Sequence, residues 1–151
     1  MTALEERARS KGVFELMAGN NKIKILILSD RLHDEAKVLA GYLRCTGGFE
    51  VVGIAGDRQQ ALKIAQKQAF DYLIIAGYLK IEYNYGVIAE LQRQKREFVT
   101  IQWAILDSLI TTFCQRYDIP LKFERTRPLA DFVEFLSIHK NNPLPDYGKD
   151  A

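Results

Sequence analysis

The chain has 151 residues, 48% of them apolar, which is enough to bury the core of one domain of ordinary size. The formal net charge is +2 and the charged residues are mixed along the chain, so the sequence gives no indication of binding to nucleic acid or to an anionic membrane. Cys45 and Cys114 lie far apart, the N-terminal segment is charged, and no apolar run approaches the roughly 20 residues that span a bilayer. These features exclude a membrane-spanning protein and predict a soluble one in a reducing, cytoplasmic environment.

Short strands and amphipathic helices are predicted to alternate from residue 23 onward. The β-branched run Ile23–Leu28 is typical of a strand buried in a parallel sheet. Asp34–Arg44 has apolar residues at helical spacing, and Gly47 and Gly48 end that helix. Asp57 is placed to cap the next helix. The remaining predicted strands are 49–54, 71–76, 98–103 and 121–125, and the remaining helices follow Asp57 and cover 87–96, 107–117 and 129–139.

Five strands that alternate with helices in this way predict an α/β domain of the (βα)5 type. Such strands pair in parallel through right-handed crossovers, which gives a three-layer, doubly wound parallel sheet with helices on both faces. In these sheets the functional crevice lies beyond the carboxyl ends of the strands. Those ends carry Ser29, Asp30, Ala76, Gly77, Trp103, Ala104 and residues 126–128.

Two stretches of the sequence resemble a known family. Residues 70–76 (FDYLIIA) and residues 49–57 (FEVVGIAGD), the latter followed by QAL at 60–62, are similar to strands of response-regulator receiver domains of the chemotaxis-regulator kind. The resemblance covers residues 22–139 and implies the flavodoxin-like strand order 2-1-3-4-5. It also implies a role in bacterial two-component signal transduction, in which phosphorylation of an aspartate switches the receiver.

The residues that carry receiver chemistry are mostly replaced in this chain. Members of the family have two acids after the first strand, the phosphorylated aspartate ending the third, a hydroxyl ending the fourth, and lysine-proline after the fifth. The corresponding residues here are Ser29 and Asp30, Ala76, Trp103 with Ala104, and Arg127 with Pro128. An alanine methyl cannot be the nucleophile, and one carboxylate is a poor site for the divalent cation that phosphoryl transfer needs. The resemblance therefore implies a degenerate pseudo-receiver with a vestigial phosphorylation pocket and no enzymatic activity.

The surviving polar residues of this pocket have alternative interpretations. Asp30 is a weak candidate metal ligand, and an ion pair with Arg127 is the interpretation that we favour; no other metal ligand and no cofactor is predicted. Arg127 could instead bind an anion, because a planar guanidinium suits phosphate and carboxylate. Trp103 could stack on a ligand, but we expect it to pack in the core and to fill the empty pocket.

The segment after Ala76 also departs from the receiver pattern. Residues 77–86 lack the usual proline, and the segment looks longer than its counterpart in the family. We expect Tyr78, Tyr83 and Tyr85 to be exposed there and to form an interaction loop, since tyrosine is enriched in protein interfaces. Isolated exposed aromatic residues are also common, so the alternative of three unrelated surface tyrosines stays open.

The predicted function is protein–protein interaction without phosphorylation, with a partner that the sequence does not identify. A homodimer could form through the face made by helices 107–117 and 129–139 and strand 121–125, or through a helix at the N-terminus. The alternative is a sensor of a small anionic ligand, held in the vacated crevice by Arg127 and loop amides. An enzyme or a flavin carrier is disfavoured, because no glycine-rich phosphate loop, nucleophile elbow or metal cluster follows a predicted strand.

The sequence divides into three predicted parts. Residues 1–20 form a helical extension, because Leu4, Val13 and Phe14 are available to pack and Gly19 can end the helix. Residues 21–140 form the receiver-like domain. Residues 141–151, which contain two prolines and a glycine, form a flexible tail.

Overall fold

The computed structural model describes residues 22–141, which alternate between strands and helices. The strands are β2 (Ile23–Leu28), β3 (Phe49–Ala55), β4 (Tyr72–Ala76), β5 (Val99–Ala104) and β6 (Leu121–Glu124). The helices are α2 (His33–Cys45), α3 (Arg58–Lys67), α4 (Gly86–Arg93), α5 (Ser108–Arg116) and α6 (Leu129–Asn141), and a short 3-10 helix, η2 (Glu82–Tyr85), precedes α4. Each strand and helix that the sequence predicts between residues 23 and 139 is present.

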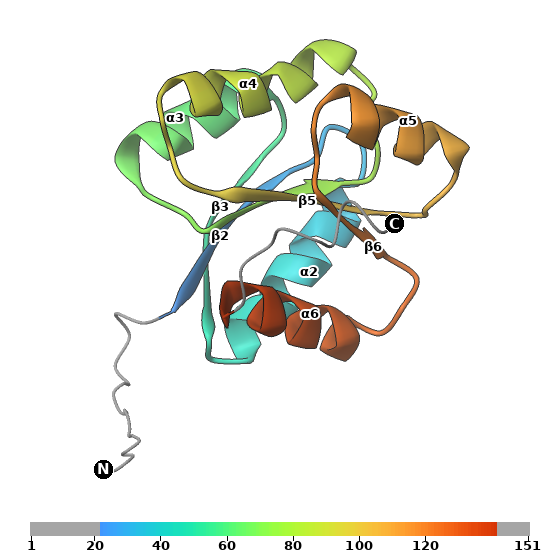
Figure 1. Ribbon diagram of the computed structural model, residues 1–151. Helices are drawn as coiled ribbons and strands as arrows, with labels where there is room; N and C mark the ends of the chain where they lie inside the picture. The colour runs from blue at the N-terminus through green and yellow to red at the C-terminus, as the bar shows by residue number, and fades with distance from the viewer. Residues whose placement is uncertain (1–21, 142–151) are drawn as a thin grey trace.

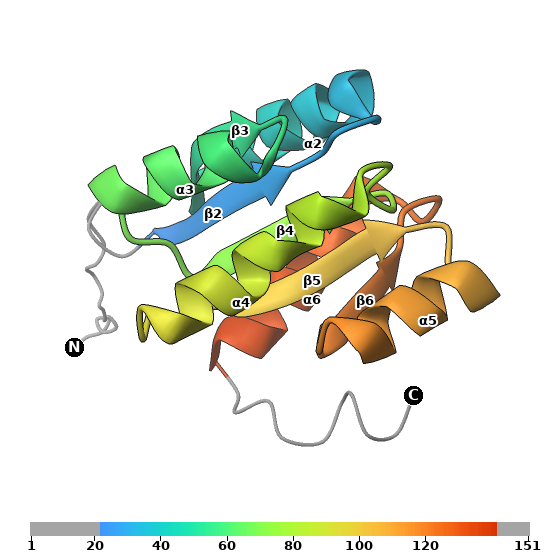
Figure 2. The same cartoon turned by 90° about the horizontal axis from the view of Figure 1, so that it is seen from above.

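The five strands form one parallel sheet in the order β3-β2-β4-β5-β6. Because β2 is the first strand of the domain, this order is the predicted 2-1-3-4-5. Helices α2 and α6 cover one face of the sheet, and α3, α4 and α5 cover the other (Figures 1 and 2). The structure therefore confirms the three-layer, doubly wound α/β architecture and its flavodoxin-like strand order.

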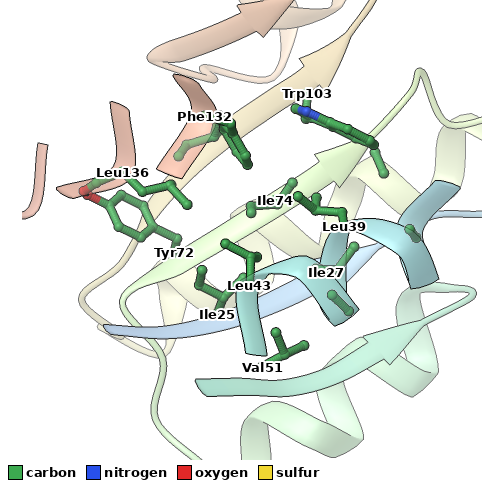
Figure 3. Packing of buried hydrophobic residues seen from close by; sticks show 14 of the residues in the cluster. Ile25, Ile27, Leu39, Leu43, Val51, Tyr72, Ile74, Trp103, Phe132 and Leu136 are labelled. Carbon is green, nitrogen blue, oxygen red and sulfur yellow. The ribbon is translucent and has the colours of Figure 1, made fainter. Parts of the chain in front are cut away.

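One half of the core lies between the sheet and the α2/α6 layer. Ile25 and Ile27 of β2 are fully buried there, and Phe132 of α6 is fully buried in the same cluster, on the side of Trp103 (Figure 3). The hydroxyl of Tyr72 on β4 donates a hydrogen bond of 3.0 Å to the Leu136 carbonyl, which fastens α6 to the central strand. Burial raises the pKa of Tyr72 to about 12, so this donor keeps its proton at neutral pH.

The other half of the core lies under α3, α4 and α5. All five residues of β4 are buried, as expected of a central parallel strand covered on both faces. The predicted cap of α3 is confirmed, since the Asp57 carboxylate accepts a hydrogen bond of 2.9 Å from Gln60 N. Asp107 caps α5 in the same way, through a hydrogen bond of 2.9 Å from Ile110 N.

The two predicted appendages lie outside the described residues. The helical extension at 1–20 precedes residue 22, and all but the first residue of the predicted tail at 141–151 follows residue 141. The predicted division of the chain into three parts stays a prediction. Within residues 22–141, no helix is long and apolar enough to cross a membrane.

Candidate functional site

The carboxyl ends of the parallel strands meet at one edge of the sheet, and the loops that follow them contain most of the predicted site residues (Figure 2). Ser29, directly after β2, is buried and joins two of these loops. Its hydroxyl donates a hydrogen bond of 3.3 Å to the Ala76 carbonyl and accepts one of 2.9 Å from Leu32 N. Ser29 therefore has a structural role in holding the end of β4 beside the start of α2.

Ala76 and Trp103 lie opposite each other where β4 and β5 end. Ala76 is fully buried, and Trp103 is only 4% exposed, with its ring centroid 6.2 Å from that of Phe132 (Figure 3). The indole Nε1 has no hydrogen-bond partner among residues 22–141. Ala104, the next residue, is buried against the opposite layer of helices. The structure confirms that Trp103 packs in the core; that it fills a former phosphorylation pocket stays a prediction.

The Asp30 carboxylate holds the loop that follows β4. Oδ1 accepts a hydrogen bond of 2.7 Å from Lys80 N, and Oδ2 accepts bonds of 2.9 Å from Ile81 N and 3.1 Å from the Asn84 side-chain amide. The predicted ion pair of Asp30 with Arg127 is therefore wrong. Backbone N–H groups of the neighbouring loop occupy both carboxylate oxygens instead.

Arg127 belongs to the start of α6. Its backbone N–H donates a hydrogen bond of 3.1 Å to the Glu124 carbonyl, which closes a turn directly after β6. The guanidinium then lies 3.3 Å from the Asp131 carboxylate and 4.8 Å above the Phe123 ring. Pro128 follows as an exposed residue whose carbonyl accepts from Asp131 N at 3.0 Å. The turn thus directs Arg127 towards α6 and away from Asp30.

The predicted tyrosine loop places its three aromatic side chains in different surroundings. Tyr83 is 59% exposed, Tyr78 is half-buried, and Tyr85 is fully buried. The Tyr85 ring stacks on Tyr117 with centroids 4.5 Å apart, and its hydroxyl accepts a hydrogen bond of 3.0 Å from Leu79 N. Burial raises the pKa of Tyr85. The prediction that all three tyrosines are exposed is wrong for Tyr85, because the 3-10 helix η2 turns that residue into the core.

A second contact ties η2 to α5. The Glu82 carboxylate accepts hydrogen bonds from the Arg116 guanidinium, at 2.6 Å, and from the Tyr117 hydroxyl. These two donors lower the pKa of Glu82, the Tyr117 hydroxyl more than the Arg116 guanidinium. The loop after β4 is therefore held at Asp30 on one side and at α5 on the other.

We expect the η2–α5 contact to loosen in acid. A lowered pKa in the folded state means that the Glu82 contribution is fully present above the ordinary value of 4.5 and is lost as pH falls below it. NMR shifts of the Tyr117 ring and of the amides of residues 82–85 should show a titration step with its midpoint below pH 4.5. The step should vanish in Glu82→Gln and persist in the control Glu134→Gln. A midpoint at or above 4.5 in the unmodified protein would contradict the hydrogen-bonded geometry.

A pocket of about 250 Å³ opens at the same edge of the sheet. Two arginines line it: the Arg31 guanidinium lies 4.3 Å above the Tyr78 ring, and Arg125 is half-buried directly after β6. The other lining residues are Leu32, Gly77, Tyr78, Ala104, Ile105, Asp107 and Ile110. Sequence reasoning missed both arginines, although their positions immediately after Asp30 and after the last strand were available as a signal.

The wall of this pocket depends on a glycine in a left-handed conformation. Gly77 has a φ of +75°, and a Cβ at this position would lie 2.7 Å from Leu32 Cδ1. The amide of Gln102 donates to the Gly77 carbonyl at 2.5 Å and to the Ile75 carbonyl at 3.1 Å. These contacts fix the backbone of Gly77 at the pocket wall.

The remaining predictions concern metals and the dimer face. Within residues 22–141, no group of three His, Cys, Asp or Glu side chains is arranged to hold a metal ion. The face predicted for a homodimer consists of α5, the edge strand β6 and α6. Leu109 of α5 and Ile138 of α6 are exposed large apolar side chains on these helices.

Comparisons with known proteins find similarity at the level of the fold. No family model matches the sequence, and no curated protein matches it. Solved structures of response regulators do match the structure. A DNA-binding response regulator of the LuxR family from Staphylococcus aureus is 14% identical, with 79% of this chain and 99% of that chain covered and a TM-score of 0.64.

Two further solved structures also match with low sequence identity and high coverage. One is from the complex of the P1 domain of CheA3 with CheY6 from R. sphaeroides, with 10% identity, 81% of this chain and 99% of that chain covered, and a TM-score of 0.67. The other is the receiver domain of RcsB from Salmonella enterica serovar Typhimurium, studied with the phosphomimetic BeF3−, with 15% identity, 86% and 98% coverage, and a TM-score of 0.63. Residues 22–141 thus have the receiver fold.

Proposed function

We propose that this chain is a receiver-like signalling module that works by binding a protein partner and is not switched by phosphorylation. The state of Asp30 is the observation that carries the proposal. Both oxygens of this carboxylate accept hydrogen bonds from the loop after β4, at 2.7 to 3.1 Å. These three bonds use most of the roughly four acceptor sites of a carboxylate. Asp30 therefore has little capacity left for Mg²⁺, which prefers several oxygen ligands in near-octahedral geometry.

The neighbouring positions support the same proposal. Ala76 offers a methyl group where a receiver needs a carboxylate nucleophile, and the hydroxyl of Ser29 already bonds to the Ala76 carbonyl. Trp103 has an indole in the core where a receiver has a hydroxyl for the phosphoryl oxygens. The nucleophile and the phosphoryl-binding hydroxyl are replaced, and the cation site is reduced to Asp30, so these residues give phosphoryl transfer no route.

The fold neighbours suggest the class of partner. CheY6, in one of the matched structures, is in complex with the P1 domain of CheA3, so a receiver fold of this shape can bind another signalling protein. We propose a partner from bacterial two-component signalling in the cytoplasm. Three large apolar side chains in the loop before α5 and in its first turn are exposed and suit such a contact: Ile105 by 50%, Leu106 by 39% and Leu109 by 45%.

A homodimer through α5, β6 and α6 is a second use that we propose for this region, and a mass measurement in solution tests it.

Addition of Mg²⁺ and beryllofluoride tests the absence of phosphorylation chemistry. The mimic needs an acceptor carboxylate and a bound cation, so amide NMR spectra of this protein should remain unchanged around Asp30, Ala76 and Gly77. The RcsB receiver, which has been studied with BeF3−, is the positive control under the same conditions. Saturable shifts at these amides would show that the switch chemistry survives and would overturn the proposal.

A further inference from the structure

The geometry points to a binding site for a small organic monocarboxylate in the pocket formed by Arg31, Arg125 and the apolar residues between them. This inference goes beyond the proposed signalling role and does not depend on it. It starts from two arginine residues. They come from loops after the first and last strands of the domain, yet both line one pocket of about 250 Å³.

Among residues 22–141, no carboxylate forms an ion pair with either arginine. The ion pairs of the described arginines join Arg93 to Glu90, Arg116 to Glu82 and Arg127 to Asp131, and none within residues 22–141 includes Arg31 or Arg125. An arginine fork that is free of internal pairing matches a planar carboxylate through two parallel hydrogen bonds.

The backbone fixes where Arg125 starts, and an aromatic ring limits where Arg31 can go. Arg125 N donates a hydrogen bond of 3.0 Å to the Ala104 carbonyl, so the β5–β6 ladder continues to the pocket wall. The Arg31 guanidinium stacks on Tyr78, with its carbon 4.3 Å from the ring centroid. Stacking leaves the edge of the guanidinium, which carries the N–H groups, available to a ligand. The Arg31 guanidinium is therefore held beside the pocket in advance, and the backbone of Arg125 is fixed at the pocket wall.

The charge in the pocket favours a monoanion over a dianion. Asp107 also lines the pocket, where its Oδ1 caps α5 by accepting from Ile110 N. Among the lining residues, two arginines and one aspartate leave a single positive charge to be matched. The carboxylate of Glu124, which is outside the lining and accepts a hydrogen bond of 3.0 Å from Leu106 N, offsets part of the charge of Arg125. The two arginines attract a dianion more strongly than a monoanion, but a dianion costs far more to remove from water and is also repelled more strongly by Asp107. The higher desolvation cost is therefore the reason to favour a monocarboxylate over a phosphate dianion.

The other lining residues indicate which chemical groups the rest of the ligand should carry. Leu32, Ala104, Ile105 and Ile110 supply apolar surface, and Tyr78 supplies an aromatic ring. The volume of about 250 Å³ lies just below the range of roughly 300–1,000 Å³ that drug-sized ligands occupy. The site thus fits a small carboxylic acid with an aromatic or branched apolar body.

Benzoate is the probe with which we would test this site. Titration followed by amide NMR should give saturable shifts at Gly77, Ala104 and Ile105, with a dissociation constant on the order of 1 mM for a ligand of this size. Benzamide, the neutral analogue, and inorganic phosphate should each bind at least about tenfold more weakly. Benzamide binding as tightly as benzoate would overturn recognition of an anion, and tighter binding of phosphate would overturn the assignment to a monocarboxylate.

Matched arginine variants locate the binding. Arg125→Gln and Arg31→Gln should each weaken benzoate binding about tenfold, because each removes a charge-assisted hydrogen bond. Arg125→Lys should give an intermediate loss, since it keeps the charge without the fork. The control Arg127→Gln removes an exposed arginine that pairs with Asp131 outside the pocket and should leave the affinity unchanged. An equal loss in Arg127→Gln, or no loss in Arg125→Gln, would refute the site. Failure of benzoate to bind would overturn the inference, and it would leave the beryllofluoride result, and hence the proposed signalling role, untouched.

Discussion

Replacing Trp103 with alanine should lower the free energy of unfolding by about 3–5 kcal/mol, the usual cost of removing a buried aromatic side chain. The indole is 4% exposed, packs against Phe132 and lies within the core under α2 and α6. A loss of this size is a large part of the roughly 5–15 kcal/mol that stabilises a typical domain. Urea unfolding followed by circular dichroism measures it.

Trp103→Phe is the matched control for this substitution. It keeps an aromatic ring and removes the indole Nε1, which has no hydrogen-bond partner among the described residues. A buried donor without a partner is itself unfavourable, so the loss of ring volume is partly offset and the net cost should be about 1 kcal/mol. If alanine and phenylalanine had equally small effects, Trp103 would not be the core residue described above, and a role in binding would have to be reconsidered.

The second large effect is expected at Asp30. Asp30→Ala removes the acceptor of three hydrogen bonds to Lys80, Ile81 and Asn84. Water can replace part of these bonds because the loop lies at the surface, so we expect a loss of about 2 kcal/mol rather than the full sum of charged hydrogen bonds. Hydrogen exchange at the amides of Lys80 and Ile81 should accelerate more than exchange in the core, because the loop is released locally.

Two further variants are controls for the stability loss in Asp30→Ala, and addition of Mg²⁺ tests whether Asp30 binds a metal. Asp30→Asn keeps one acceptor oxygen and should lose about half as much as alanine. Glu134→Ala, an exposed acid of α6, should change stability by less than about 0.5 kcal/mol. Addition of Mg²⁺ should not stabilise the unmodified protein. Stabilisation by Mg²⁺ that disappears in Asp30→Ala would mean that Asp30 is a metal ligand.

The fold could be predicted almost completely because its signals are local and repeated. Ile23–Leu28 and residues 71–76 are apolar runs of strand length, and each is followed by a helical pattern before the next strand. Asp57 stands at a helix start, where its side chain can reach the free N–H of Gln60. Once five such units alternate, the rule of right-handed parallel crossovers leaves few arrangements open.

The site was harder to predict because it depends on turns. The resemblance to receivers places the cation that follows the last strand at Arg127, but β6 ends at Glu124 and a turn directs Arg127 to α6. Arg125 is the residue that lines the pocket instead. Because of this turn, Arg125 lines the pocket while Arg127, two residues later, contacts Asp131 of α6. No periodic pattern in the sequence predicts such a change of direction.

Tyr85 shows a signal that was present but overlooked. Tyr85, Ile88 and Leu91 recur at every third residue across the start of α4, and all three are buried. That spacing places them on one face of a helix that begins earlier than predicted. Grouping Tyr85 with Tyr78 and Tyr83 by residue type concealed this pattern, because residue type alone does not distinguish an interface tyrosine from a core tyrosine.

The hydrogen bonds on Asp30 also bias any exchange of the loop after β4 towards the arrangement in which they form. A switch requires two arrangements of the loop after β4 that differ by only a few kcal/mol. If the carboxylate favours the held loop by about 2 kcal/mol, it makes the released loop about thirtyfold rarer than it would otherwise be. A partner that binds the released loop would therefore need about 2 kcal/mol of additional binding free energy for that arrangement to offset this bias. A partner that binds the held loop would not have this cost.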